Sequence, residues 1–286
     1  MQPILCIVGP TCSGKTAYAL EIARRQPTEI ISADSRQVFR FMDIGTAKPS
    51  KEFLQEIKHH FIDIVNPDEE YSAGLFGHQA ALVVTEIQAR GNTPLVVGGS
   101  GLYIRALIDG LHRAPGHDDR MRKRLEERIA TEGVDALLHE LQQLDPESAA
   151  GITMKHQRRI VRALEVLEAT GIPLSQWKRD QEPRPFTAQL IGLQWERSAL
   201  YQRINQRVDE MMKEGLLEEV EMLQSKGHTD ALQSLNSPGY KELFGYLRGE
   251  HSLDRAVELI KQHTRNFAKR QETWFRKDER IEWVQR

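Results

Sequence analysis

The chain has 286 residues, of which 40% are hydrophobic and 28% charged, and its formal net charge is −2. This length can form one large α/β domain, or one domain with an appended lobe. The near-neutral charge argues against a protein that coats nucleic acid, although it leaves room for local basic patches. Two cysteines, Cys6 and Cys12, are too few for a disulfide framework or a usual zinc site. No basic leader precedes Ile4 and no apolar run has membrane-spanning length, so we expect a cytoplasmic enzyme.

The first predicted element is a buried strand that leads into a phosphate-binding loop. The apolar run 4–8 is followed by the octapeptide Gly9-Pro10-Thr11-Cys12-Ser13-Gly14-Lys15-Thr16. The glycines let backbone N–H groups converge on one anion, Lys15 can reach terminal phosphate oxygens, and the Thr16 hydroxyl can hold Mg²⁺. The helix that begins at residues 13–14 points the positive end of its dipole at the same anion. A glycine-rich turn without a ligand is the alternative, and the strand–loop–helix context favours phosphate or pyrophosphate binding.

Alternating strands and helices follow over the first third of the chain. Strands are expected at 4–8, 29–33, 61–65 and 94–97, and an amphipathic helix at 72–90. Such alternation predicts a mostly parallel sheet covered by helices, with ligands bound beyond the carboxyl ends of the strands. The residues at two of those ends are Asp34-Ser35 and Gly98-Gly99-Ser100-Gly101.

The polar segments at these strand ends are candidates for chemistry. Asp34 can orient Mg²⁺, cap a helix, or take a proton from an attacking group, and the polar stretch 45–49 favours a ligand loop. The segment 97–103 lacks the third glycine of a dinucleotide fingerprint, so we interpret it as backbone that approaches a ligand closely, with Ser100 as a donor. The only candidate for the second acidic motif of an ATPase is Asp63, which is weak, so ATP hydrolysis is disfavoured as the main activity.

The pattern changes to purely helical near residue 117 and returns to strand at 189–193, after the proline-containing stretch 182–185. We therefore predict one domain formed by residues 1–115 and 183–286, and an inserted domain at 116–182. The remaining elements are expected as helices at 198–214, 216–226, 239–248 and 253–271 and a strand at 281–284. The predicted fold class is α/β: a P-loop-containing parallel sheet core flanked by helices, with an inserted all-helical lobe.

Basic residues gather in three places. They are Arg120, Arg122, Lys123 and Arg124, then Arg158, Arg159 and Arg162, and finally Lys261, Arg265 and Lys269 on the last helix. A basic stripe is usually a solvated face, but three of them, with Trp274 and Phe275 close by, suit phosphate contacts and base stacking. Arg203 and Arg207 are one helical turn apart, and we expect both to point toward the phosphate-binding loop.

Together these segments resemble the bacterial tRNA dimethylallyltransferase family. The resemblance rests on 9–16, 32–39, 43–49, 97–103, 162–166, 239–242, 268–271 and 273–276, in order along almost the whole chain. It implies transfer of a dimethylallyl group from dimethylallyl pyrophosphate to N6 of the adenine just 3′ of the anticodon, adenosine 37, with Mg²⁺. The implied partner is the anticodon stem-loop of tRNA, with no membrane involved, and we expect a monomer. The loop would bind a pyrophosphate leaving group instead of ATP.

The resemblance also implies roles for single residues. Asp34 matches the family's base, Ser100 a hydroxyl near that base, and Arg207 an arginine that binds pyrophosphate. Substrate-binding positions are Gly9, Pro10, Thr11, Cys12, Ser13, Gly14, Lys15 and Thr16, and Thr16 would also hold the magnesium ion. Positions that match tRNA contacts are Asp34, Ser35, Arg36, Gln37, Ser100, Arg122, Arg158, Arg159, Arg162, Gly239, Tyr240, Lys241, Lys269, Arg270, Gln271, Trp274 and Arg276. The chain departs from the family pattern at Cys12, Phe39, Ser100, Arg158 and Pro238; Ser100 replaces a threonine and keeps its hydroxyl.

Two other functions use part of the same evidence. A small-molecule transferase, such as a nucleotide kinase or an adenylate isopentenyltransferase, would need neither the helical insertion nor the basic, aromatic C-terminus. A non-catalytic RNA-binding protein would not need intact Lys15, Thr16 and Asp34.

Overall fold

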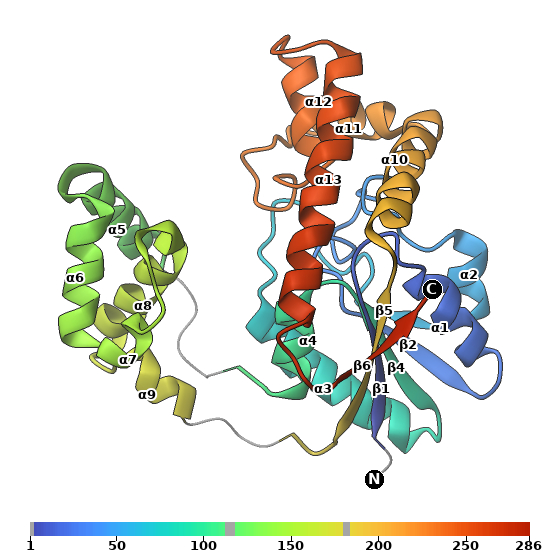
Figure 1. Cartoon of the computed structure of the whole chain (residues 1–286), viewed down its shortest axis with the longest axis horizontal. Helices are drawn as coiled ribbons and strands as arrows, with labels where there is room; N and C mark the ends of the chain where they lie inside the picture. Colours follow the sequence, from blue (N-terminus) through green and yellow to red (C-terminus); the bar gives the residue numbers. More distant parts are fainter. Residues whose placement is uncertain (1–2, 112–117, 180–183) are drawn as a thin grey trace. The chain divides into compact units, whose positions relative to one another are not determined.

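A computed structural model describes residues 3–111, 118–179 and 184–286. The chain forms two compact units, one from Met1–Asp109 with Arg184–Arg286 and one from Gly110–Pro183. Figure 1 shows both units along the course of the chain. The domain boundaries predicted at 115/116 and 182/183 fall outside the described residues.

The first unit is built on a six-stranded sheet in which every pair of neighbours is parallel. The strands are β1 (Ile4–Val8), β2 (Thr28–Ser32), β3 (His59–His60), β4 (Thr93–Gly98), β5 (Ala188–Gln194) and β6 (Ile281–Gln285). Their order across the sheet is β3-β2-β4-β1-β5-β6. The prediction of a parallel α/β core is confirmed.

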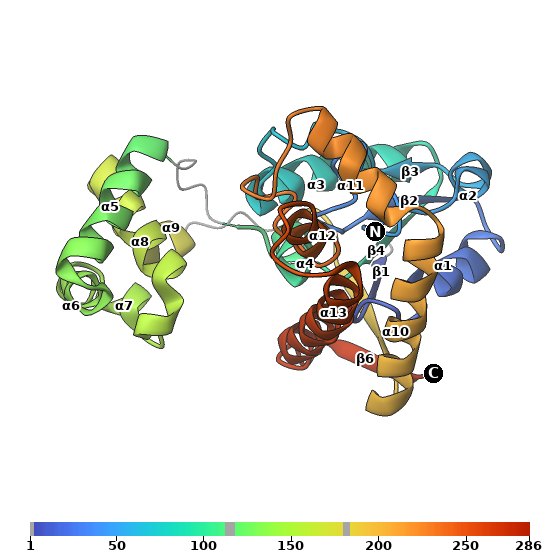
Figure 2. The same cartoon turned by 90° about the horizontal axis from the view of Figure 1, so that it is seen from above.

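Helices cover both faces of this sheet because its strands alternate apolar side chains between the two faces. On one face, Cys6 and Val8 of β1 belong to a buried cluster with residues of α3 (Ala73–Ala89) and α4 (Gly101–Ile108). On the other face, Ile7 joins a cluster with α1 (Lys15–Ala23) and α2 (Lys51–Glu56). Figure 2 shows the two pairs of helices on opposite sides of the sheet. Helices α2 and α4 were not among the elements expected from the sequence.

Four helices lie beyond the carboxyl ends of the strands, at the top of the larger unit in Figure 1. They are α10 (Arg197–Lys213), α11 (Leu216–Ser225), α12 (Tyr240–Leu247) and α13 (Leu253–Phe275). Helix α13 continues to Phe275, one turn beyond its expected end, and the Phe275 side chain is buried. The basic stripe on α13 is divided: Lys261 pairs with Asp209 of α10 at 2.5 Å and Arg265 donates to Asn205 of α10 at 2.6 Å, whereas Lys269 is exposed.

The prediction of a strand at 61–65 is wrong. The third strand is limited to His59–His60, and Val65 forms only an isolated bridge with Phe39. The reason lies in the backbone: φ is 65° at Phe61 and 55° at Asp63, and a residue with positive φ cannot continue an extended strand. The Asp63 carboxylate pairs with Lys48 at 2.5 Å, so it helps to fix the polar segment 43–49.

Helices are the regular secondary structure of the second unit within residues 118–179. Its helices are α5 (Asp119–Glu132), α6 (Val134–Leu144), α7 (Pro146–Ala149), the 3₁₀ helix η1 (Met154–His156), α8 (Gln157–Thr170) and α9 (Leu174–Arg179). A core that includes Leu125, Leu141 and Leu164 holds them together. The buried Glu165 accepts hydrogen bonds from Asp118 N and Arg162 Nη1, at 2.9 and 2.8 Å. Across the described parts of both units, no helix has the length and apolar character needed to span a membrane.

Candidate functional site

The Gly9–Thr16 loop curls at the carboxyl end of β1 and leads into α1. Positive φ values occur at Gly9 (147°), Cys12 (63°) and Gly14 (87°). A Cβ atom on Gly9 would lie 2.8 Å from the carbonyl oxygen of Leu193 on β5, so this position has no room for a side chain. At Cys12 a residue with a side chain adopts the left-handed conformation, which costs roughly 1–2 kcal/mol. Because α1 begins at Lys15, the unpaired N–H groups of its first turn face the loop.

Lys15 folds back over this loop. Its Nζ donates to the carbonyl oxygens of Gly9 and Pro10, at 3.0 and 2.7 Å. Loss of water around the ammonium lowers the pKa of Lys15 to about 8; Arg207 acts in the same direction, whereas Asp34 and Cys12 oppose the shift. An anion bound in the loop would stabilise the charged ammonium and raise this pKa.

Side chains from distant elements hold the outer side of the loop. The indole Nε1 of Trp195 donates to Ser13 O at 3.0 Å, and Arg203 Nε donates to Cys12 O at 3.0 Å. The Arg203 guanidinium also lies over the Trp195 ring, 4.4 Å from its centroid. These donors bind carbonyl oxygens on the outer side of the loop. Because C=O and N–H point in opposite directions in a trans peptide, the N–H groups of the same peptides point away from Trp195 and Arg203. Trp195 was missed from the sequence, although its position directly after β5 places it at the edge where ligands bind.

Arg203 and Arg207 of α10 both reach the loop, as the sequence predicted, but they make different contacts. Arg203 holds a loop carbonyl. Arg207 places Nη1 3.6 Å from the Cys12 sulfur and lines a cavity beside the loop. Of the two, Arg207 is therefore the one placed to meet a ligand.

Asp34 lies two residues beyond the end of β2, where the chain turns. Its Oδ1 accepts hydrogen bonds from the backbone N–H groups of Arg36 and Gln37, at 2.8 and 3.4 Å. No helix starts here, so the helix-cap role considered from the sequence does not apply. The Ser100 hydroxyl accepts from Ser35 N at 2.9 Å and donates to Ser35 Oγ at 3.2 Å. Ser100 thus fixes the segment that carries the Asp34 carboxylate.

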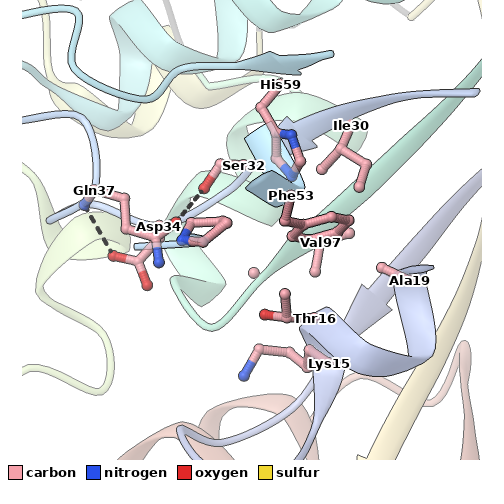
Figure 3. Close-up of a pocket in the computed structure, with 12 residues that line it drawn as sticks. Lys15, Thr16, Ala19, Ile30, Ser32, Asp34, Gln37, Phe53, His59 and Val97 are labelled. Atoms are coloured by element: carbon pink, nitrogen blue, oxygen red, sulfur yellow. Dashed lines mark hydrogen bonds between the residues drawn. The ribbon is translucent and has the colours of Figure 1, made fainter. Parts of the chain in front are cut away.

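Two cavities share Asp34. Lys15, Thr16 and Asp34 line the smaller one together with the apolar side chains of Ala19, Ile30, Phe53 and Val97 (Figure 3). Thr11, Cys12, Asp34, Ser100 and Arg207 are among the residues that line the larger one, which extends to Thr264, Phe267 and Arg270 on α13. The carboxylate of Asp34 therefore lies where a ligand held by the loop can meet a second molecule that enters from α13.

The glycines at positions 98, 99 and 101 make room for other parts of the protein. Gly98 also lines the smaller cavity, so the close approach of this backbone to a ligand stays a prediction. A Cβ on Gly98 would lie 2.1 Å from Ala33 O. One on Gly99 would lie 2.3 Å from Nε2 of Gln271, and one on Gly101 would lie 2.1 Å from the Trp274 ring. Close packing of this segment against β2 and α13 therefore requires the glycines.

The polar segment 43–49 is held by a buried carboxylate. Glu219 on α11 accepts hydrogen bonds from the N–H groups of Asp43, Ile44 and Gly45 at 2.8, 2.7 and 3.0 Å. The Tyr240 hydroxyl donates to the same carboxylate at 2.7 Å. Tyr240 is fully buried, and burial together with Glu219 raises its pKa well above the ordinary value. Its side chain offers no surface to RNA, so the structure assigns it to holding this segment instead of the predicted tRNA contact.

The other positions predicted to touch tRNA differ in what they expose. Exposed side chains in the first unit belong to Lys241, Lys269, Arg270, Trp274 and Arg276, and in the second unit to Arg158 and Arg159; Ser35, Arg36, Gln37, Arg122 and Arg162 are partly buried, and Gly239 is buried at the start of α12. Gln37 is occupied inside the protein, because it accepts from Ser32 Oγ at 2.9 Å and donates to Thr46 O at 3.3 Å. Gln271 is buried, and its amide contacts the backbone of Thr11 and Gly99. Phe275 is also buried and cannot stack on a base.

A magnesium ion would find oxygen donors at the smaller cavity. Among the described residues no group of three or more His, Cys, Asp or Glu side chains could hold a metal ion. Thr16 and Asp34 nevertheless both line the smaller cavity. Mg²⁺ commonly binds with one or two protein oxygens and completes its shell with phosphate and water, so these residues fit such an ion.

Comparison with known proteins gives one consistent answer. The family model for IPP transferase matches residues 37–278. The chain is 47% identical to tRNA dimethylallyltransferase 2 of Geotalea uraniireducens over 99% of its own length and 92% of that protein, and 45% identical to tRNA dimethylallyltransferase of Acetivibrio thermocellus at similar coverage.

Solved structures of similar fold come from the same family as the sequence relatives. The structure of tRNA isopentenylpyrophosphate transferase from Bacillus halodurans superposes with a TM-score of 0.74 at 40% identity, covering 100% of this chain and 90% of that one. A eukaryotic dimethylallyltransferase described as acting on tRNA superposes with a TM-score of 0.83 at 25% identity, covering 100% of this chain and 74% of that one. From the sheet, the loops at its carboxyl edge and these matches, we conclude that the chain belongs to the IPP transferase family.

Proposed function

We propose that the chain transfers the dimethylallyl group of dimethylallyl pyrophosphate to N6 of adenosine 37 in tRNA and releases pyrophosphate. The observation that carries the proposal is the position of Asp34, which lines both the cavity next to Lys15 and Thr16 and the cavity that reaches α13. A donor held by the loop and a base that enters from α13 would meet at this carboxylate.

Charge neutralisation of the leaving group is the first task of the site. An allylic carbon bonded to pyrophosphate ionises once the developing negative charge is stabilised. Lys15, the amides of the Gly9–Thr16 loop and Arg207 supply positive charge or N–H donors around this position. Magnesium held by Thr16 would add Lewis-acid stabilisation of the phosphate oxygens.

Proton removal from the acceptor is the second task. The exocyclic amine of a stacked adenine is out of reach, so the base must leave the stack and enter the larger cavity. Asp34 would accept the amine proton as the new C–N bond forms, while Ser100 keeps the Asp34 segment in place through Ser35.

Recognition of RNA is assigned to the exposed basic and aromatic side chains. In the first unit these are Lys241, Lys269, Arg270, Trp274 and Arg276, and the helical unit adds Arg158 and Arg159. Lysine and arginine contacts to phosphates position a nucleic acid, and Trp274 can stack on a base. The exposed basic and aromatic side chains of the first unit alone exceed what a mononucleotide acceptor requires.

The choice of acceptor tests the proposed function. Supplied with Mg²⁺ and radiolabelled dimethylallyl pyrophosphate, the protein should label a tRNA with adenine at position 37, and leave AMP and ADP essentially unlabelled. A tRNA with guanosine at position 37 is the matched control. Efficient labelling of AMP would instead identify a small-molecule transferase, and tight tRNA binding without label transfer by donor-bound protein would identify a non-catalytic binder.

Asp34→Asn tests the base. Asparagine keeps the oxygen that accepts from Arg36 N, so the turn and the fold should persist. Loss of the proton acceptor should lower single-turnover transfer by about 10²–10⁴-fold, the usual contribution of a general acid–base group, with donor affinity nearly unchanged. Asp68→Asn, at an exposed aspartate, is the control and should leave the rate unaltered. A near-normal rate for Asp34→Asn would remove Asp34 from the chemistry.

The lowered pKa of Lys15 predicts a pH dependence of donor binding. Above a pH of about 8 the free protein loses the Lys15 charge, so binding the anionic donor must take up a proton. Affinity for dimethylallyl pyrophosphate should therefore fall as pH rises through 8, approaching about tenfold per pH unit at higher pH. Titration calorimetry from pH 7 to 9.5 measures this, and Lys15→Met corrects for ionisation of the ligand itself. Parallel profiles for the two proteins would show that Lys15 is not the titrating group.

A further inference from the structure

Gln271 joins two loops that are distant in the sequence. Its Oε1 accepts a hydrogen bond from Thr11 N at 2.8 Å, and its Nε2 donates to Gly99 O at 2.9 Å. Gln271 is 8% exposed; its bond to Gly99 is buried and its bond to Thr11 is partly buried. One planar amide thus uses its acceptor on one loop and its donor on the other, and each interaction fixes the orientation of the other.

The two bridged segments carry the two halves of the proposed chemistry. Thr11 belongs to the Gly9–Thr16 loop, which would hold the pyrophosphate leaving group. Gly99 precedes Ser100, whose hydroxyl holds Ser35 and so the segment of Asp34. A change in the length or tilt of the Gln271 bridge would therefore alter the distance between the leaving group and the base.

The packing around Gln271 leaves little freedom for this spacing. A Cβ on Gly99 would lie 2.3 Å from Nε2 of Gln271, so the backbone of Gly99 approaches the amide directly. One turn further along α13, the Trp274 ring contacts Gly101 in the same way. Helix α13 therefore rests on the segment 98–101 at two consecutive turns, with the Gln271 amide providing the polar link to the Gly9–Thr16 loop.

We propose that Gln271 is a positioning residue, which sets the spacing between the pyrophosphate-binding loop and the base Asp34. The inference rests on the proposed function. It also gives this residue a role inside the protein in place of the tRNA contact implied by family resemblance, because Gln271 is only 8% exposed and its amide oxygen and nitrogen each bond to the protein backbone. A residue of this kind acts on the geometry of the transition state more than on the affinity for either substrate.

Gln271→Met tests the proposal, because methionine has a similar volume and lacks both hydrogen-bonding groups. A misplacement of about 1 Å can cost on the order of 10²-fold in rate, so single-turnover transfer should fall by about 10–100-fold. Affinities for dimethylallyl pyrophosphate and for tRNA, each measured alone, should change by less than about threefold, since each loop keeps its own residues. Gln262→Met, at an exposed glutamine of the same helix, is the control and should retain the wild-type rate.

Gln271→Glu adds a readout that a merely structural role would not move. A protonated glutamic acid can accept from Thr11 N and donate to Gly99 O, whereas a carboxylate would place an oxygen against the Gly99 carbonyl. The rate of Gln271→Glu relative to wild type should therefore rise as pH is lowered from 8.5 to 5.5. This measurement also serves if Gln271→Met does not fold.

The outcomes separate this inference from the function on which it rests. An inactive wild-type protein would contradict the proposed function, whereas the positioning role is judged only from ratios to active wild type. A folded Gln271→Met with an unchanged rate would overturn the positioning role. A rate loss matched by an equal loss of donor or tRNA affinity, or a relative rate of Gln271→Glu that does not vary with pH, would overturn it as well.

Discussion

Parallel pairing of β4 with both β1 and β2 is the constraint on which the site depends. Val8 of β1 pairs with Gly98 of β4, and Ser32 of β2 pairs with Val97, so three strands end at the same level. The Gly9–Thr16 loop follows β1 directly, and Asp34 and Ser100 each lie two residues beyond the ends of β2 and β4. Because parallel strands all present their carboxyl ends at one edge, strand pairing alone makes neighbours of residues that are far apart in the sequence.

The strands bring the loops together, and side chains from later helices then fix their conformations. Trp195 and Arg203 bind carbonyl oxygens on the outside of the Gly9–Thr16 loop, and Glu219 binds three N–H groups of the segment 43–49. These polar groups lie at the edge of the core, where an unpaired donor or acceptor would cost about 1–3 kcal/mol. The helices beyond the sheet therefore shape the site as well as cover it.

The local patterns of the sequence were sufficient to predict the sheet, the Gly9–Thr16 loop and the position of Asp34 at a strand end. They were insufficient where the structure is determined by an unusual backbone conformation or by contacts between residues distant in the sequence. Phe61 and Asp63 look like strand residues but adopt positive φ, and the glycines at 98–101 reflect contacts with Gln271 and Trp274 that no local pattern reveals. Family resemblance named candidate tRNA-contacting residues, yet it could not separate exposed Lys269 and Arg270 from buried Tyr240 and Gln271.

The central claim is that donor and acceptor meet at Asp34. A crystal structure of the protein with an unreactive thio-analogue of dimethylallyl pyrophosphate and an anticodon stem-loop tests it most directly. The account predicts pyrophosphate oxygens against Lys15 and Arg207, with N6 of the extruded adenine about 2.6–3.2 Å from the Asp34 carboxylate, the distance a general base requires. A pyrophosphate bound outside the Gly9–Thr16 loop, or an adenine whose N6 points away from Asp34, would contradict it.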